Sequence, residues 1–201
     1  MITLLFDSSD NRLSVGIADD TKLIESTTYE CWQTQSEEMI PEIKKLMDKY
    51  GYTRKDIKDV VVGIGPGSYT GIRISITIAK TIGLALSCPV YPISSLQILK
   101  DFDKPSICIL NARSKRSYVG VYQNEKCLFK DQILTNEELL DYIKLHNDYS
   151  LCGDLKYLNL EGVVTNPIEQ MFSVKKYLVK AEDNLTIKPV YLKEEYAPVK
   201  Y

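Results

Sequence analysis

The sequence predicts an α/β protein built from two similar lobes, because the chain matches itself at a nearly constant spacing. Residues 2–25 align with residues 106–129 at an offset of 104 positions. In both segments an apolar run is followed by a polar turn, an alternating run, a second turn and another run. This pattern predicts three strands joined by two hairpins in each lobe.

Identical residues support the duplication. Four residue types recur at the same offset, and these are Arg12, Val15, Gly16 and Lys22 in the first copy and Arg116, Val119, Gly120 and Lys126 in the second. The same residues recur together with the same order of elements, which favours duplication over chance.

A helix and a further strand are predicted after each set of three strands. Residues 36–44 align with residues 136–144, now at an offset of 100, and the change in length falls in a loop. Ser36 in the first copy, and Asn136 or Thr135 in the second, are suitable N-cap residues. The strands that follow are predicted at residues 60–64 and 149–152.

We divide the chain into an N-terminal lobe, residues 1–103, and a reduced C-terminal lobe, residues 104–201. A connecting helix is expected over residues 94–101. This order of elements is the lobe plan of the superfamily of actin, sugar kinases and heat-shock ATPases, in which the sheet is ribonuclease-H-like. The plan predicts a fold of two actin-like lobes, each a mixed sheet with helices, and does not by itself predict a function.

Composition limits the classes of function. Hydrophobic residues make up 44% of the chain, charged residues 26%, and the net charge is -2, so the chain is an ordinary globular protein without the basic surplus of a stand-alone nucleic-acid binder. The N-terminal residues do not resemble a signal peptide, and residues 72–90 contain Arg73 and Lys80, which argues against a membrane span. Five cysteines without CxxC spacing indicate reduced thiols and a cytoplasmic protein.

Two segments are candidates for contact with nucleotide phosphates. In the superfamily, the first hairpin of each lobe approaches the phosphates, and a glycine-rich turn before a helix exposes N–H groups that favour anions. The candidate contacts are Asp7, Ser8, Ser9, Gly65, Gly67, Ser68, Thr70, Gly71 and Arg73. The alternative is that Asp7 caps a turn and that the glycine segment is a tight turn with Ser68 or Thr70 as N-cap.

The sequence lacks the residues that catalysis or metal binding would require. Asn111 stands opposite Asp7 in the second copy and cannot supply the second carboxylate. His146 is the single histidine, so a zinc site fails on ligand count, and we place His146 at the end of a helix. We therefore expect no catalytic residue, no metal and no required cofactor, with at most weak binding of ATP or ADP.

The predicted helix after the glycine segment has more apolar surface than one sheet can cover. A helix on a sheet needs an apolar stripe only about 100° wide, whereas here apolar residues surround most of the helix. Ser75, Ala79 and Gly83 form a seam of small residues, which suits close approach of a second helix. We interpret the seam as a surface that pairs with another molecule; the alternative is a helix buried within one large domain.

At this point the sequence resembles the TsaB (YeaZ) family. The resemblance rests on residues 65–73, Gly-Pro-Gly-Ser-Tyr-Thr-Gly-Ile-Arg, with the Ile/Ala/Gly-rich helix behind them, and it is supported by Leu-Phe-Asp-Ser-Ser near the start, by the helix that begins at Ser36-Glu37, by residues 111–113 and by residues 189–193. It covers nearly the whole chain. Gln35 and Asn111 depart from the family's usual histidine and aspartate, and the C-terminal region is short.

The resemblance implies a non-catalytic subunit of the machinery that makes threonylcarbamoyladenosine at position 37 of tRNAs reading codons that begin with A. It implies pairing with a TsaD-type catalytic subunit, cooperation with a TsaE-type ATPase, a homodimer when alone, and contact with tRNA only through the complex. The contact carried over from the family comprises Ile72, Ile76, Ala79, Lys80, Gly83 and Leu86. We expect Ala79→Arg or Gly83→Arg to disrupt pairing while the lobes stay folded.

Two other functions remain open from the sequence. The first is a stand-alone ATPase or small-molecule kinase of the actin-like superfamily, which would require ATP turnover that depends on Asp7. The second is a direct tRNA-binding module, because Arg113, Lys115 and Arg116 cluster in the second copy's first hairpin. Such a cluster is more often a solvated turn.

Overall fold

The first sheet has five strands in the order β3-β2-β1-β4-β5. The computed structural model describes residues 1–31 and 33–192. The strands are β1 (Ile2–Asp7), β2 (Arg12–Ala18), β3 (Leu23–Glu30), β4 (Ile57–Gly63) and β5 (Val90–Ile93). Strands β1, β2 and β3 form an antiparallel meander, and β4 and β5 run parallel to β1. Every residue of β1 is buried, as expected for a central strand covered on both faces.

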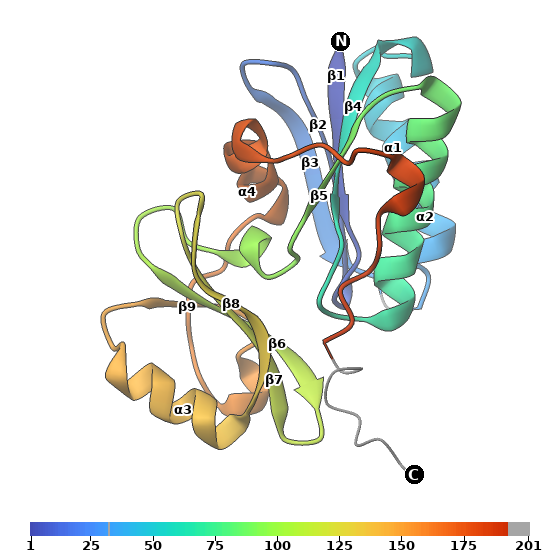
Figure 1. Cartoon of the computed structure of the whole chain (residues 1–201). Helices are drawn as coiled ribbons and strands as arrows, with labels where there is room; N and C mark the ends of the chain where they lie inside the picture. Colours follow the sequence, from blue (N-terminus) through green and yellow to red (C-terminus); the bar gives the residue numbers. More distant parts are fainter. Residues whose placement is uncertain (32, 193–201) are drawn as a thin grey trace.

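Helices cover both faces of this sheet (Figure 1). Helices α1 (Gln35–Lys49) and α2 (Tyr69–Leu86) pack on the face that carries Leu4 and Phe6. Leu5 points to the opposite face, where it meets α4 (Pro167–Val174). The alternation of side chains along a strand thus divides the apolar residues of β1 between two hydrophobic cores.

The second sheet repeats the plan of the first with four strands in the order β8-β7-β6-β9. Its elements are β6 (Ser106–Arg113), β7 (Arg116–Gln123), β8 (Lys126–Thr135), α3 (Asn136–Leu145) and β9 (Ser150–Gly153). Strands β6, β7 and β8 form a meander, and β9 runs parallel to β6 as β4 does to β1. The predicted duplication and fold class are confirmed, and the strands expected at residues 60–64 and 149–152 shift by at most three residues at their ends.

Of the two N-cap positions predicted from the sequence, one is confirmed and one is wrong. Thr135 caps α3, where its hydroxyl accepts the N–H of Glu138 and the Glu138 carboxylate accepts the N–H of Thr135. The predicted cap Ser36 instead lies inside α1, whose cap position is Thr34. His146 ends α3, as predicted, and its ring stacks on Tyr142.

The prediction of a connecting helix over residues 94–101 is wrong, except for a single helical turn. Only the 3-10 helix η2 (Gln97–Leu99) forms there. The Ser94 hydroxyl accepts the N–H groups of Leu96 and Gln97, which closes a turn. Three residues after Gln97, the Lys100 side chain is buried and donates to Gln170 Oε1 at 2.7 Å. The segment follows these side-chain contacts, and no regular helix continues through it.

The chain beyond β9 returns to the first sheet, which differs from the predicted division at residue 103. The returning elements are α4 and the 3-10 helices η4 (Lys175–Tyr177) and η5 (Asn184–Thr186). The 3-10 helix η3 (Lys156–Leu158) packs on the second sheet, and a further one, η1 (Arg54–Asp56), precedes β4. Helix α4 contacts β1, β2 and β3, and η5 contacts α2. Residues 104–163 therefore form the second unit, since Val163 still bridges to β9, and most of the following segment completes the first.

Close packing and a buried ion pair hold the returning segment in place. A Cβ on Gly16 of β2 would lie 2.3 Å from Ile168 Cγ2, so only glycine admits α4 this close to the sheet. Lys175 Nζ lies 2.8 Å from Asp59 Oδ2 and also donates to Thr3 Oγ1. The other carboxylate oxygen, Asp59 Oδ1, is buried without a hydrogen-bond partner among the described residues. Lys175 is thus the group that balances a buried charge.

Within the described part of the chain, the longest helices lack the run of apolar residues that would be needed to cross a bilayer.

We predict that Lys175→Ala lowers the free energy of unfolding by about 3 kcal/mol, because it leaves Asp59 buried and unpaired. Urea unfolding followed by circular dichroism measures the change. Lys176→Ala serves as the control, because the neighbouring Lys176 is exposed and makes no ion pair among the described residues. Equal stability of the two variants would show that the Asp59–Lys175 pair does not hold the returning segment.

Candidate functional site

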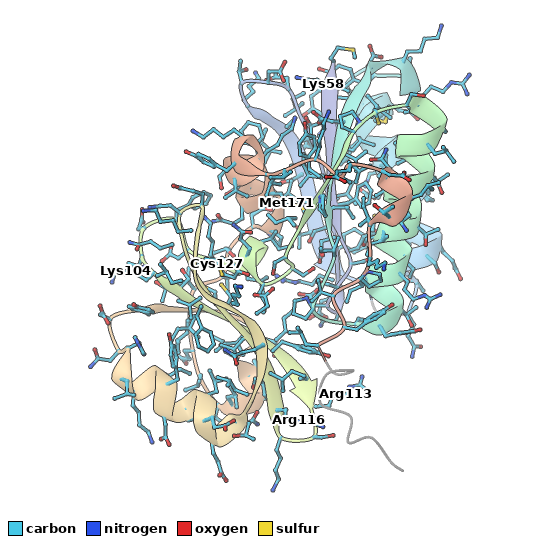
Figure 2. All side chains as sticks on the ribbon, viewed as in Figure 1. Lys58, Lys104, Arg113, Arg116, Cys127 and Met171 are labelled. Atoms are coloured by element: carbon cyan, nitrogen blue, oxygen red, sulfur yellow. The ribbon has the colours of Figure 1, made fainter. Side chains whose placement is uncertain are left out.

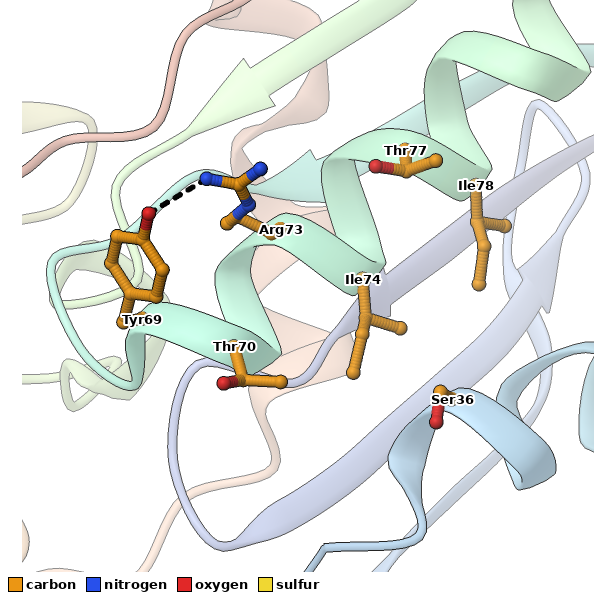
Figure 3. A pocket seen from close by; sticks show the side chains of 7 residues that line it. All are labelled: Ser36, Tyr69, Thr70, Arg73, Ile74, Thr77 and Ile78. Atoms are coloured by element: carbon orange, nitrogen blue, oxygen red, sulfur yellow. Dashed lines mark hydrogen bonds between the residues drawn. The ribbon is translucent and has the colours of Figure 1, made fainter.

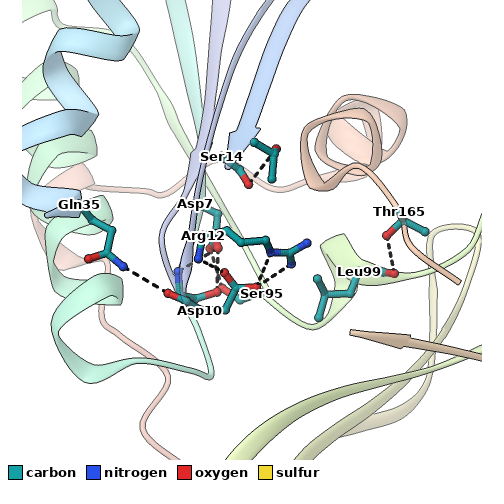
Figure 4. Close-up of polar contacts among 10 residues, drawn as sticks. Asp7, Asp10, Arg12, Ser14, Gln35, Ser95, Leu99 and Thr165 are labelled. Carbon is teal, nitrogen blue, oxygen red and sulfur yellow. Dashed lines mark hydrogen bonds and ion pairs between the residues drawn. The ribbon is translucent and has the colours of Figure 1, made fainter. Parts of the chain in front are cut away.

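The loop after β1 and the glycine segment after β4 meet at the first candidate site. Asp7 Oδ2 accepts the backbone N–H and the hydroxyl of Ser9 at 2.9 and 2.7 Å, and Asp7 Oδ1 accepts the Ser95 hydroxyl at 2.9 Å (Figure 4). Burial raises the pKa of Asp7, and the nearby charge of Asp10 raises it further. The carboxylate is therefore already bonded on both oxygens by the chain itself.

The hydroxyls at this site bond to the start of α2. Ser8 Oγ donates to Gly71 O at 2.9 Å and lies 2.7 Å from Ser75 Oγ. The Ser68 N–H donates to Ser9 O at 2.6 Å, and Ser68 Oγ accepts the N–H of Gly71 as the N-cap of α2. The first N–H groups of the helix are thus partly satisfied within the chain.

Glycines are required here because two stretches of backbone approach closely. A Cβ on Gly67 would lie 2.2 Å from Ser9 O, and a Cβ on Gly71 would lie 1.8 Å from Ser8 O. A Cβ on Gly63 would lie 1.8 Å from Asp7 Oδ1. The glycine segment packs against the loop after β1, which is the arrangement of a tight turn and leaves these glycines facing protein atoms.

The structure brings seven of the nine predicted phosphate contacts together. Asp7, Ser8, Ser9, Gly65, Gly67, Ser68 and Gly71 gather at this junction, and Thr70 and Arg73 lie on the exposed side of α2. The hydrogen bonds match the alternative interpretation, in which Asp7 caps a turn and Ser68 caps the helix. No group of three or more histidine, cysteine or carboxylate side chains in the described ranges could hold a metal ion. Nucleotide binding stays a prediction.

The residues of α2 that we predicted to pair with another molecule lie mostly on the buried side of the helix. Ile72, Ile76, Ala79 and Gly83 are buried in the protein's own fold, and Ser75 of the small-residue seam is buried as well. Of the six residues carried over, only Lys80 and Leu86 are partly exposed, and Lys80 Nζ donates to Leu185 O while Leu86 packs on the first core. The seam faces the sheet and the returning segment because small residues let both approach.

The substitutions expected to spare the fold would therefore damage it. Ala79 has no exposed surface. A Cβ on Gly83 would lie 2.5 Å from Asn184 Nδ2 and 2.7 Å from Val90 Cγ2. An arginine at either position has no space without displacing the core.

The opposite side of α2 carries a shallow apolar cavity of about 380 Å³ (Figure 3). Its lining comes from α2 and from the start of α1, and the residues are Ser36, Tyr69, Thr70, Arg73, Ile74, Thr77 and Ile78. We call this surface the outer face of α2. Its isoleucines, Ile74 and Ile78, directly precede Ser75 and Ala79 of the seam in the sequence. The width of the apolar stripe therefore indicated two sides to be covered, but it did not indicate which side another molecule would cover.

Contacts between aromatic rings and a cation hold the side chains in place at one end of the outer face. Arg73 Nη1 donates to the Tyr69 hydroxyl at 2.7 Å, and the Tyr69 ring stacks on Tyr191 at a centroid distance of 5.1 Å. Further along the helix Leu84 is 64% exposed, and Ile40 on α1 is 50% exposed. The outer face therefore combines exposed apolar side chains with one fixed cation.

The two departures from the family pattern have structural roles. Gln35 is buried, and its Nε2 lies 3.4 Å from Asp10 O near the loop after β1. Asn111 is exposed, and its Oδ1 accepts the N–H of Arg113 at 2.8 Å. Asn111 thus caps its hairpin with one oxygen, as Asp7 does for Ser9. Of the predicted family segment at residues 189–193, Lys193 lies outside the described residues.

Comparisons with known proteins agree on one family. The family model described as TsaD, tRNA N6-adenosine threonylcarbamoyltransferase, matches residues 30–161. A protein of Bacillus subtilis named "tRNA threonylcarbamoyladenosine biosynthesis protein TsaB" is 32% identical over 145 residues, which cover 70% of this chain and 62% of that protein. A protein of Buchnera aphidicola with the same name is 33% identical over 151 residues, covering 72% of this chain and 70% of the relative.

A solved structure extends the likeness to the fold of nearly the whole chain. YeaZ from Pseudomonas aeruginosa superposes with a TM-score of 0.78 at 22% sequence identity, covering 95% of this chain and 99% of that protein. The sequence match to the Bacillus relative is shorter and spans less than two thirds of that protein's length. The matching residues, the repeated lobe plan and the glycine segment that begins α2 together place the chain in the TsaB (YeaZ) family.

Proposed function

We propose that the protein is a non-catalytic partner subunit of the complex that adds threonylcarbamoyl to adenosine 37 of tRNAs reading codons that begin with A. In this proposal it pairs with and supports a TsaD-type catalytic subunit, a TsaE-type ATPase joins them, and tRNA binds only through the complex. The work takes place in the cytoplasm. The printed names of the Bacillus and Buchnera relatives support this role.

The observation that carries the proposal is the outer face of α2. Exposed apolar surface with a hollow of this size is typical of a site where another protein binds. Ile74 and Ile78 could receive apolar side chains of a partner helix, and Arg73 stands beside them where it could meet a carboxylate. We assign this face to the catalytic subunit in the complex and to a second copy of the chain when the protein is alone.

The chemistry of the Asp7 junction supports a subunit without catalysis of its own. Asp7 is buried and already accepts three hydrogen bonds from Ser9 and Ser95, and burial raises its pKa, which disfavours the charged form that a divalent cation needs. The second copy supplies Asn111, which is neutral. The stand-alone ATPase or kinase is thereby the less favoured function, and weak binding of ATP or ADP would not conflict with the proposal.

We predict that Ile74→Arg abolishes pairing with the TsaD-type subunit and dimerisation of the isolated chain. The arginine would place a charge in the apolar hollow, where a partner would have to remove it from water. Size-exclusion chromatography with light scattering gives the mass of each species.

Leu145→Arg is the matched control, because Leu145 is an exposed apolar residue at the end of α3, in the second unit. Both variants should keep the unfolding midpoint of the parent protein, since neither position is in a core. A complex of full mass with Ile74→Arg would remove the outer face of α2 from the proposal.

We further predict that Asp7→Asn affects stability in a pH-dependent way. Because burial raises the pKa of Asp7 above its ordinary value of 3.8, the folded protein holds this proton more tightly than the unfolded chain does. The contribution of Asp7 to stability is therefore greatest below pH 3.8 and is lost as the pH rises through the folded-state pKa. Relative to the parent protein, Asp7→Asn should gain stability from pH 4 to pH 7 in urea unfolding.

The same variant separates the two candidate functions. The isolated protein should show no ATP turnover above the blank, with aspartate or with asparagine at position 7, while the assembled complex modifies tRNA. ATP hydrolysis by the chain alone that Asp7→Asn abolishes would instead support the stand-alone ATPase.

A further inference from the structure

The tip of the β6–β7 hairpin concentrates positive charge. Arg113, Lys115 and Arg116 occur within four consecutive residues, and Arg113 and Lys115 are exposed. Figure 2 shows Arg113 and Arg116 at the free end of this hairpin, away from Lys104 at the other end of the same unit. The tip carries no exposed apolar side chain, because Ser114 is the remaining residue of the turn.

The backbone of this tip is held in an unfavourable conformation. Arg113, Ser114 and Lys115 have φ angles of 62°, 51° and 56°, a region that glycine or asparagine usually occupies and that costs other residues about 1 kcal/mol or more each. Two hydrogen bonds fix it: the Arg113 N–H donates to Asn111 Oδ1 at 2.8 Å, and the Asn136 N–H donates to Lys115 O at 2.9 Å. The cations are thus presented on a preorganised turn.

The hairpin differs from its counterpart in the first unit. There Asp7 pairs with Ser14, and Ser8 and Ser9 of the longer connection bond to the start of α2. In the second unit pairing continues to Arg113 and Arg116, so only two residues form the turn. The two-residue turn and its flanking residues therefore carry three cations, beside β8, which pairs with β7 as far as Arg116.

Nearby carboxylates do not neutralise these cations. Seven basic residues of the described ranges make ion pairs, for example Arg12 with Asp10 and Lys144 with Asp141, and none of the three hairpin cations is among them. The Glu138 carboxylate at the start of α3 is engaged by Thr135, and Glu137 beside it is exposed. The tip therefore keeps its positive charge in a chain whose net charge is -2.

We propose that the tip of the β6–β7 hairpin contacts the phosphate backbone of tRNA in the assembled complex, which rests on the proposed function. Guanidinium groups bind phosphate oxygens in pairs, and an ammonium group adds a point charge. A protein partner would be expected to cover apolar side chains at the centre of its contact, and this tip has none. Because the chain is acidic overall, the contact adds to binding by the catalytic subunit and does not replace it.

The test uses the complex of this protein with its TsaD-type subunit and unmodified tRNA, without nucleotide. The triple variant Arg113→Gln/Lys115→Gln/Arg116→Gln is compared with a control of equal charge, Lys104→Gln/Lys126→Gln/Lys130→Gln, whose lysines are exposed elsewhere in the second unit. The dissociation constant for tRNA is measured at several salt concentrations. Light scattering and thermal unfolding verify that both variants fold and assemble.

We expect the hairpin variant to bind tRNA more weakly and the slope of log K against log salt to fall by about 2, since each lost phosphate contact contributes roughly 0.7–0.9. The control, and the charge-conserving Arg113→Lys/Arg116→Lys, should keep the parent slope. An unchanged slope in an intact complex overturns the inference and leaves the proposed function standing. Loss of the complex itself would overturn it in favour of a protein contact. Failure of the parent proteins to assemble would refute the proposed function.

Discussion

The contact between the loop after β1 and the start of α2 determines how the rest of the first unit is organised. The Ser8 hydroxyl reaches Gly71 and Ser75, and the Ser9 carbonyl accepts the N–H of Ser68. These bonds fix the rotation of α2 about its axis, and the rotation decides which residues are buried. With the seam turned inwards, Ile74 and Ile78 are left on the outer face, so the position of the proposed partner site follows from hydrogen bonds made at the other side of the helix.

Much of the fold could be predicted because the duplication shows each strand and helix pattern twice in the sequence. Strands, hairpins and the helix start at Thr135 follow from alternation, turn residues and a capping box, which are local properties. The orientation of α2 could not be predicted from its pattern. A helix with apolar residues on most sides has two candidate buried faces, and the choice depends on the distant residues Asn184 and Val90, which pack against Gly83.

The sequence indicated most of the residues that meet at the candidate site, but it did not indicate how they bond to one another. Glycines and hydroxyls before a helix fit either a phosphate cradle or a tight turn, and sequence alone does not distinguish them. The structure favours the turn, because Ser9 and Ser95 donate hydrogen bonds to the carboxylate of Asp7. The return of residues after β9 to the first sheet was likewise invisible, since the repeat ends there and α4 has no counterpart in the first copy.

The path of the returning segment bears on the order in which the protein can fold during synthesis. Domains usually fold as units while the chain emerges, and the second unit, residues 104–163, is contiguous. The first sheet, although its strands are complete at Ile93, keeps Leu5 and Val61 uncovered until α4 has left the ribosome. The half of the molecule that is translated first is therefore completed last, and until then it presents an apolar surface on which chaperones could act.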